Sequence, residues 1–127
     1  MMKKKSKLGF SLIELLVVAT IMIVIATIGL VSYSQATRNS RNAKRKSDLE
    51  AVKQALVLYR NDNSQYPSGT NFTSMLTTIN DYISFNSVSD PKSPTYDYTY
   101  SSDASVFELC ATLETKSGIE SYCIDNP

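Results

Sequence analysis

One apolar run near the start of the chain restricts its possible folds more than any other feature. From Phe10 to Val31 there are 22 residues whose only charged side chain is Glu14, and no further charge follows until Arg38. At ~1.5 Å per residue, a helix of this length extends over ~33 Å, enough to cross the hydrocarbon layer of a membrane. We therefore expect this segment to span a membrane or to pack among copies of itself.

The residues before this run form a short basic leader that contains Lys3, Lys4, Lys5 and Lys7. In an ordinary secretory signal an apolar stretch of about 7–15 residues is followed by a cleavage site of small residues. Here the apolar run is longer, and the small residue Gly9 comes before it. By the positive-inside rule the lysines stay in the cytoplasm. The sequence therefore predicts an N-terminally anchored protein whose C-terminal part faces outward.

Glu14 is unusual in such a segment, because a carboxylate at the centre of a bilayer costs about 2.5–3.5 kcal/mol on insertion scales. One interpretation places its side chain at the membrane interface, where the N-terminal end of a helix also favours a negative charge. The other interpretation gives Glu14 a positive partner once several such helices pack together. A cut after Gly9 would supply that charge as the new amine of Phe10.

The stretch GFSLIELLVVATIMIVIATIGL resembles the N-terminus of type IV pilins and type II secretion pseudopilins. The matching elements are the lysine-rich leader, Gly9, Phe10, and Glu14 four residues after Phe10. The resemblance implies that a membrane prepilin peptidase cuts between Gly9 and Phe10 and methylates the new amine of Phe10. It also implies that Glu14 pairs with the N-terminal amine of a neighbouring subunit. The partners would be further copies in a homo-oligomeric filament and an assembly platform in the inner membrane.

No proline occurs between Phe10 and Arg60, which permits one helix of about 51 residues. Leu49, Val52 and Leu56 recur at helical spacing in its second half, so we expect this stripe to pack on the C-terminal part of the chain. Turn-forming residues at 61–64 should end the helix.

A short second helix should follow, because apolar residues recur at helical spacing from Phe72 to Ile83, with Thr70 or Thr73 near its cap. Alternation of apolar and polar residues then predicts three antiparallel strands. Their inward-facing residues are Tyr96, Tyr98 and Tyr100, then Phe107, Leu109, Ala111 and Leu113, then Tyr122 and Ile124.

Together these features predict an α+β, pilin-like fold in which a long N-terminal helix packs on a small antiparallel sheet of about three strands. We divide the chain into a leader that is removed (1–9), a transmembrane or filament-core half of the helix (10–31), an amphipathic half (32–60), and a small globular head with a C-terminal β-hairpin (61–127). The leading function is a structural subunit of a type IV pilus-like surface filament. The alternative is a type II secretion or competence pseudopilin, or a minor pilin. The protein would cross the inner membrane once, with its C-terminus outside, and after assembly would lie in an extracellular or periplasmic filament.

Cys110 and Cys123 lie in the part expected outside the membrane, where a disulfide is the natural interpretation. If the hairpin turn is centred between Lys116 and Ser117, opposite residues have numbers that sum to 233, so the two cysteines face each other. Opposite Cα atoms are then about 4.5 Å apart, within disulfide reach. A pair of free thiols is the alternative. No metal site is expected from two cysteines in a chain without histidine.

The remaining charges suggest several roles but no catalytic site, so we expect neither an enzyme nor a cofactor. Asp90, Asp97 and Asp103 are expected to be solvated loop acids. The basic segment after residue 37 is interpreted as a solvated helix face, as a surface that complements the acidic head of another copy, or as a neck near anionic lipid. Nucleic-acid binding is a further possibility without other support in the sequence. The residues concerned would be Arg38, Arg41, Lys44, Arg45 and Lys46.

Overall fold

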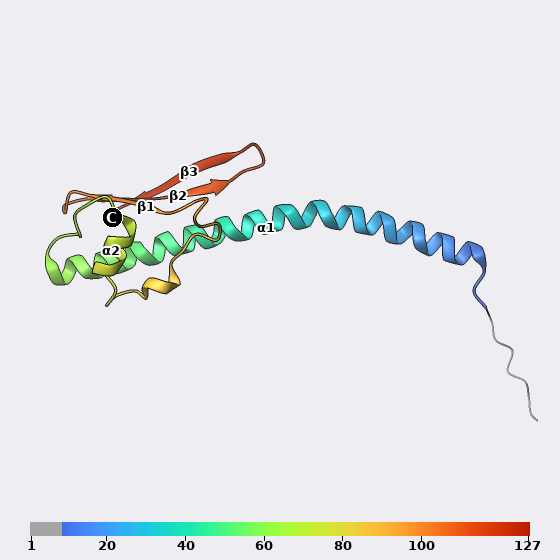
Figure 1. Ribbon diagram of the computed structural model, residues 1–127, viewed down its shortest axis with the longest axis horizontal. Coiled ribbons are helices and arrows are strands. Elements are labelled where there is room, and N and C mark those ends of the chain that lie inside the picture. Colours follow the sequence, from blue (N-terminus) through green and yellow to red (C-terminus); the bar gives the residue numbers. More distant parts are fainter. Residues whose placement is uncertain (1–8) are drawn as a thin grey trace, which may run out of the picture. The chain divides into compact units, whose positions relative to one another are not determined.

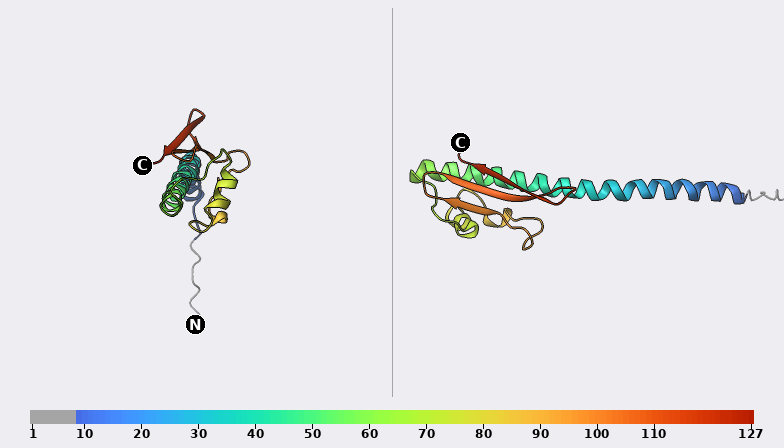
Figure 2. Two further views of the ribbon diagram at one scale, coloured as in Figure 1. Left: turned by 90° about the vertical axis from the view of Figure 1, so that its left-hand side faces the viewer. Right: turned by 90° about the horizontal axis from the view of Figure 1, so that it is seen from above.

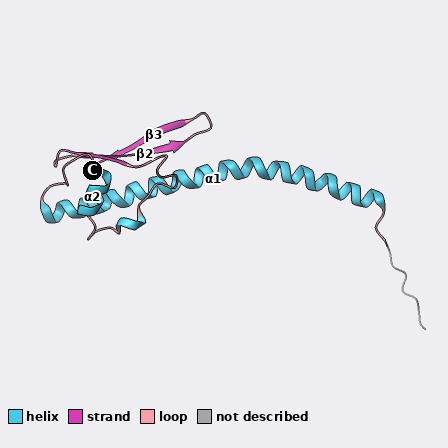
Figure 3. Ribbon diagram, in the orientation of Figure 1, coloured by secondary structure: helices cyan, strands magenta, loops and turns pink. Residues whose placement is uncertain are grey.

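The computed structural model describes residues 9–127, so the predicted leader lies outside the described residues except for Gly9. A long helix is followed by a short helix, a 3₁₀ turn and a three-stranded antiparallel sheet of order β1-β2-β3 (Figures 1 and 3). These elements are α1 (Leu12–Asn63), α2 (Phe72–Thr78), η1 (Phe85–Ser87), β1 (Thr99–Ser102), β2 (Phe107–Glu114) and β3 (Ile119–Asp125). The predicted α+β class is confirmed.

Helix α1 runs without interruption for 52 residues. It ends where the turn-forming residues predicted, and Ser64 after it adopts a positive φ of 64° while its N–H donates to the Arg60 carbonyl (2.7 Å). The chain divides into two compact units, the first ending at Ala36 and the second beginning at Thr37, and α1 contributes to both.

The first unit contains the apolar half of α1. Every described side chain from residue 10 to residue 30 is exposed, including Phe10 (87%) and Leu30 (74%). The hydroxyls of Thr20 and Thr27 donate to main-chain carbonyls three residues earlier (2.8 Å each), so neither polar group needs an outside partner. By length and composition, α1 is the one helix among the described residues that could cross a membrane.

The second unit has a hydrophobic core between the C-terminal half of α1, the sheet and α2 (Figure 2). Leu49, Val52 and Leu56 of α1 are fully buried, which confirms the predicted stripe. From the sheet, Tyr100 and Leu109 enter the same core.

Strands β2 and β3 form a hairpin with the predicted register. Leu109 pairs with Ile124, Cys110 pairs with Cys123, and each pair sums to 233. The Thr115 N–H donates to the Gly118 carbonyl (2.8 Å) to close the turn, and Gly118 has a φ of 150° that favours glycine.

Two predicted boundaries were wrong. Strand β1 begins only at Thr99, because a hydrogen-bonded turn at 92–96 occupies the preceding segment, although Tyr98 is still buried. Helix α2 ends at Thr78, so Ile83 lies beyond it. Its N-cap is Asn71, between Thr70 and Thr73, and the Asn71 Oδ1 accepts from the Ser74 N–H (2.8 Å).

Candidate functional site

The segment of the predicted cleavage site lies just before α1. Gly9 and Phe10 are exposed and outside any regular element. A Cβ placed on Gly9 would have no heavy atom within 4 Å. The Gly9–Phe10 bond therefore lies in irregular, accessible backbone, where another protein can approach it.

Glu14 and Ser11 form a capping box at the start of α1. The Ser11 N–H and Oγ both donate to Glu14 Oε2 (2.9 Å each), and the Glu14 N–H donates to Ser11 Oγ (3.3 Å). This reciprocal pattern satisfies main-chain donors that a helix start leaves free. The S-x-x-E spacing of Ser11 and Glu14 is the sequence signature of this capping box, although it was not among the predictions. Glu14 thus has a local structural role besides any role between subunits.

A buried cluster of charges lies in the second unit around Arg45, whose side chain is fully buried. Its Nε and Nη2 donate to the two carboxylate oxygens of Asp90 (2.6 and 3.0 Å), in a bidentate pair. Its Nη1 donates to Glu114 Oε1 (2.9 Å) and to Asn42 Oδ1 (3.0 Å). Arg45 therefore joins α1 to the loop before β1 and to the end of β2.

Glu114 receives two further cations. Arg41 donates to it from Nε and Nη2 (2.8 and 2.6 Å), and Lys92 donates from Nζ (3.0 Å). The hydrogen bonds from Arg41, with those from Lys92 and Arg45, hold the pKa of Glu114 well below its usual range. The main chain of Glu114 is also fixed, since its N–H donates to Asn42 Oδ1 (2.9 Å) and its carbonyl accepts from Asn42 Nδ2 (2.8 Å).

These contacts correct the interpretation of the basic segment. The interpretation as a solvated helix face is wrong for Arg45, whose side chain is buried and paired with Asp90. Arg41 is also paired with a carboxylate, that of Glu114. Lys44 pairs with Asp48 (3.0 Å), and Lys46 lies 4.9 Å from the Tyr122 ring centroid. Much of the proposed nucleic-acid surface is therefore used within the chain.

The expectation for the loop acids was wrong at one of three positions. Asp90 is buried, whereas Asp97 and Asp103 are exposed as predicted. No local signal separates Asp90 from the other two, because its partner Arg45 is 45 residues away in the sequence.

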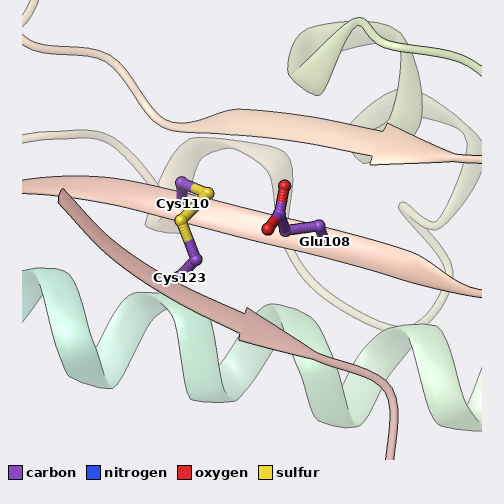
Figure 4. Close-up of side chains that lie close together, drawn as sticks. All are labelled: Glu108, Cys110 and Cys123. Atoms are coloured by element: carbon purple, nitrogen blue, oxygen red, sulfur yellow. A yellow bond between two sulfur atoms is a disulfide. The ribbon is translucent and has the colours of Figure 1, made fainter.

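Cys110 and Cys123 are joined by a disulfide, with their Cα atoms 4.1 Å apart (Figure 4). They lie on the face of the hairpin away from the core, where Cys123 is exposed. The Glu108 carboxylate is on the same face, with its oxygen and both sulfurs within 4.8 Å of one another. Because both sulfurs are bonded to each other, neither offers the thiolate that a metal would need.

Comparison with known proteins connects the N-terminal segment to a family. Residues 4–30 match the family described as "Prokaryotic N-terminal methylation motif". The chain is 34% identical over 67 residues to "Type II secretion system core protein G" of Klebsiella michiganensis, and 31% identical over 67 residues to the protein of the same name from Aeromonas hydrophila. Each match covers 53% of this chain and 47% of the relative, so the chain spans about half the length of the curated relatives it matches. No solved structure matches it. The resemblance inferred from the sequence is confirmed.

Proposed function

We propose that this chain, which carries the prepilin-type N-terminal motif of the pilin and pseudopilin family, is a structural subunit of a type IV pilus-like surface filament. The observation that carries the proposal is the exposure of every described side chain from residue 10 to residue 30. Such a large apolar surface must be covered by something outside the chain. Lipid covers it before assembly, and the same segment of other copies covers it in the filament.

Processing would prepare the chain for assembly. A prepilin peptidase cuts between Gly9 and Phe10, in the irregular backbone before α1, and methylates the new amine of Phe10. The match of residues 4–30 to the methylation motif supports this step. The lysine-rich leader stays on the cytoplasmic side, the chain crosses the inner membrane once, and the head lies outside. The Cys110–Cys123 disulfide suits an oxidising compartment.

Glu14 would then guide assembly at an inner-membrane platform. A carboxylate enclosed by apolar helices is costly unless it meets a positive group. The methylated amine of Phe10 on a neighbouring copy supplies that group. The hydrogen bonds from Ser11 hold the Glu14 carboxylate at the start of α1. The amine that cleavage would create on Phe10 lies four residues before Glu14 in the same chain.

A secretion pseudopilin is the second candidate, because both curated relatives carry the name of a type II secretion core protein. The surface-filament candidate is supported by the disulfide of the C-terminal hairpin, which resembles the loop that many pilins close in this way. Both candidates share processing at Gly9, assembly through α1 and an outward-facing head.

The deciding experiment is to shear cells and to examine the released material by electron microscopy and mass spectrometry. Filaments built chiefly of chains that begin at methylated Phe10 are the expected result. Processed chains that remain with the membrane, without surface fibres, would favour the secretion pseudopilin. Chains that keep Met1 or an unmodified amine would contradict both candidates.

A matched pair of glycine variants controls for the effect of bulk. Gly9→Val should block cleavage and leave the leader in place. Gly29→Val, in the middle of α1 and with equally open space around its Cβ, should be cleaved as before.

A further inference from the structure

A groove lies between α2 and the loop that leads from η1 to β1, and we propose that it binds a neutral saccharide. Its volume is about 630 Å³, within the range of about 300–1,000 Å³ that is usual for ligand sites. The groove belongs wholly to the second unit of the chain. The proposal does not depend on filament assembly.

The lining of the groove combines two kinds of surface. Phe72 provides partly exposed aromatic surface, and the largely buried side chains of Leu76, Val88 and Tyr98 form the apolar floor behind it. Around it lie hydroxyl and amide side chains, which both donate and accept hydrogen bonds. A sugar ring has the same division, with an apolar C–H face and a rim of hydroxyls. The hydroxyl and amide side chains are Thr70, Asn71, Thr73, Asn86, Ser89, Ser93 and Thr99.

The charge of the groove decides which saccharides fit. Among the described residues, neither lysine nor arginine lines it. Of its two carboxylates, Asp90 is buried and neutralised by Arg45. Asp97 is exposed and accepts from Ser93 Oγ (2.7 Å), so its negative charge remains at the rim. An anionic ligand would meet no compensating charge, whereas a neutral sugar could donate hydroxyl hydrogens to Asp97.

The walls of the groove are held in place by groups outside it. The bidentate pair with Arg45 fixes Asp90, which also accepts from the Lys92 N–H (2.7 Å). The Tyr98 hydroxyl donates to Asp48 Oδ2 (2.8 Å), and its ring meets that of Phe72 edge-on at 5.5 Å. A site formed before the ligand arrives loses less conformational entropy on binding.

Saturation-transfer NMR on the full-length chain tests the proposal. The detergent must be zwitterionic and free of sugar, because maltoside or glucoside head groups would compete for the groove. The probes are cellotetraose, maltotetraose and chitotetraose as neutral oligosaccharides, with trigalacturonate as the anionic comparison. We expect saturation transfer to at least one neutral probe and none to trigalacturonate.

Two threonines of α2, one turn apart and both exposed, provide matched variants. Thr73 lines the groove and Thr77 does not. Thr73→Arg should place a long side chain in the groove and weaken binding by about tenfold or more, whereas Thr77→Arg should leave affinity within about twofold. Equal thermal unfolding of both variants and the wild type would show that the fold is intact.

Three results would overturn the proposal. The first is no transfer to any neutral probe, and the second is preferential transfer to trigalacturonate. The third is binding by Thr73→Arg that equals binding by the wild type. None of them affects the proposed filament function, which is measured separately on sheared material.

Discussion

The two halves of α1 share one continuous helix but obtain their stability in opposite ways. Up to residue 30 every described side chain is exposed, and Glu14 is the single charge. From Thr37 onward the helix buries Leu49, Val52 and Leu56 against its own head and buries the guanidinium of Arg45 as well. The difference shows that helical structure alone does not tell whether a segment buries its apolar side chains within its own chain. The first half needs surroundings from outside the chain, whereas the second half has its partners within it.

The largest expected effect concerns the first half of α1, which depends on contacts outside the chain. Glu14→Gln keeps an acceptor for the capping box but removes the charge. If Glu14 pairs with an amine inside the filament, loss of the pair costs about 3–5 kcal/mol and lowers the filament yield in the sheared fraction by about 100-fold or more. Unfolding of the head should be unchanged.

Ser11→Ala is the control for that experiment, because it removes the capping hydroxyl and keeps the charge. It should cost about 1 kcal/mol and reduce yield far less. Normal assembly of Glu14→Gln together with failure of Ser11→Ala would show that capping is the main role of Glu14.

The second prediction concerns the head alone. Arg45→Met leaves the buried Asp90 carboxylate and Glu114 without their shared cation, so the free energy of unfolding should fall by about 3–5 kcal/mol. Urea unfolding followed by tyrosine circular dichroism measures it, since the chain has no tryptophan. Lys44→Met removes a half-exposed cation and leaves Asp48 its hydrogen bond from the Tyr98 hydroxyl (2.8 Å), so it should cost about 1 kcal/mol or less. Similar losses for both variants would contradict a special role of the buried cluster.

The third prediction concerns the disulfide, which closes a loop between residues 13 apart in sequence. The variant with Cys110→Ser and Cys123→Ser should lose about 2–3 kcal/mol of head stability. The hairpin register should persist, because Leu109 and Ile124 still pack inward. The wild type with a reducing agent should match the double variant, and a difference between them would point to a cause other than the bond.

The fourth prediction concerns the contribution of Glu114 to the acid sensitivity of the head. Its pKa is lowered in the folded head, chiefly by Arg41, so its stabilisation is present above the unfolded value of about 4.3 and is lost as the pH falls below it. The free energy of unfolding should therefore decrease on acidification. Glu114→Gln should be less stable at neutral pH but should change less between about pH 6 and about pH 3.

Glu120→Gln is the matched control for acid sensitivity, because Glu120 is exposed on β3. It should retain the acid sensitivity of the wild type. An unchanged slope in Glu114→Gln would contradict the assignment.

Much of the molecule could be predicted from the sequence because it depends on short-range patterns. The apolar run, the absence of proline and the stripe at Leu49, Val52 and Leu56 follow from helical periodicity. The pairing of Cys110 with Cys123 follows from the position of one turn, because an antiparallel register is fixed once its turn is fixed. The motif of Gly9, Phe10 and Glu14 also lies within one short stretch of sequence.

The tertiary structure alone decided which charges are buried. Arg45 resembles its basic neighbours in the sequence, and Asp90 resembles the other loop acids. The two carboxylates that pair with Arg45 are those of Asp90 and Glu114, which lie 45 and 69 residues away along the chain, so no local pattern indicates these pairs. The groove beside α2 likewise combines segments that are separate in sequence. Periodicity reports which face of an element is apolar, but burial of a charge depends on which distant groups the fold brings within hydrogen-bonding distance.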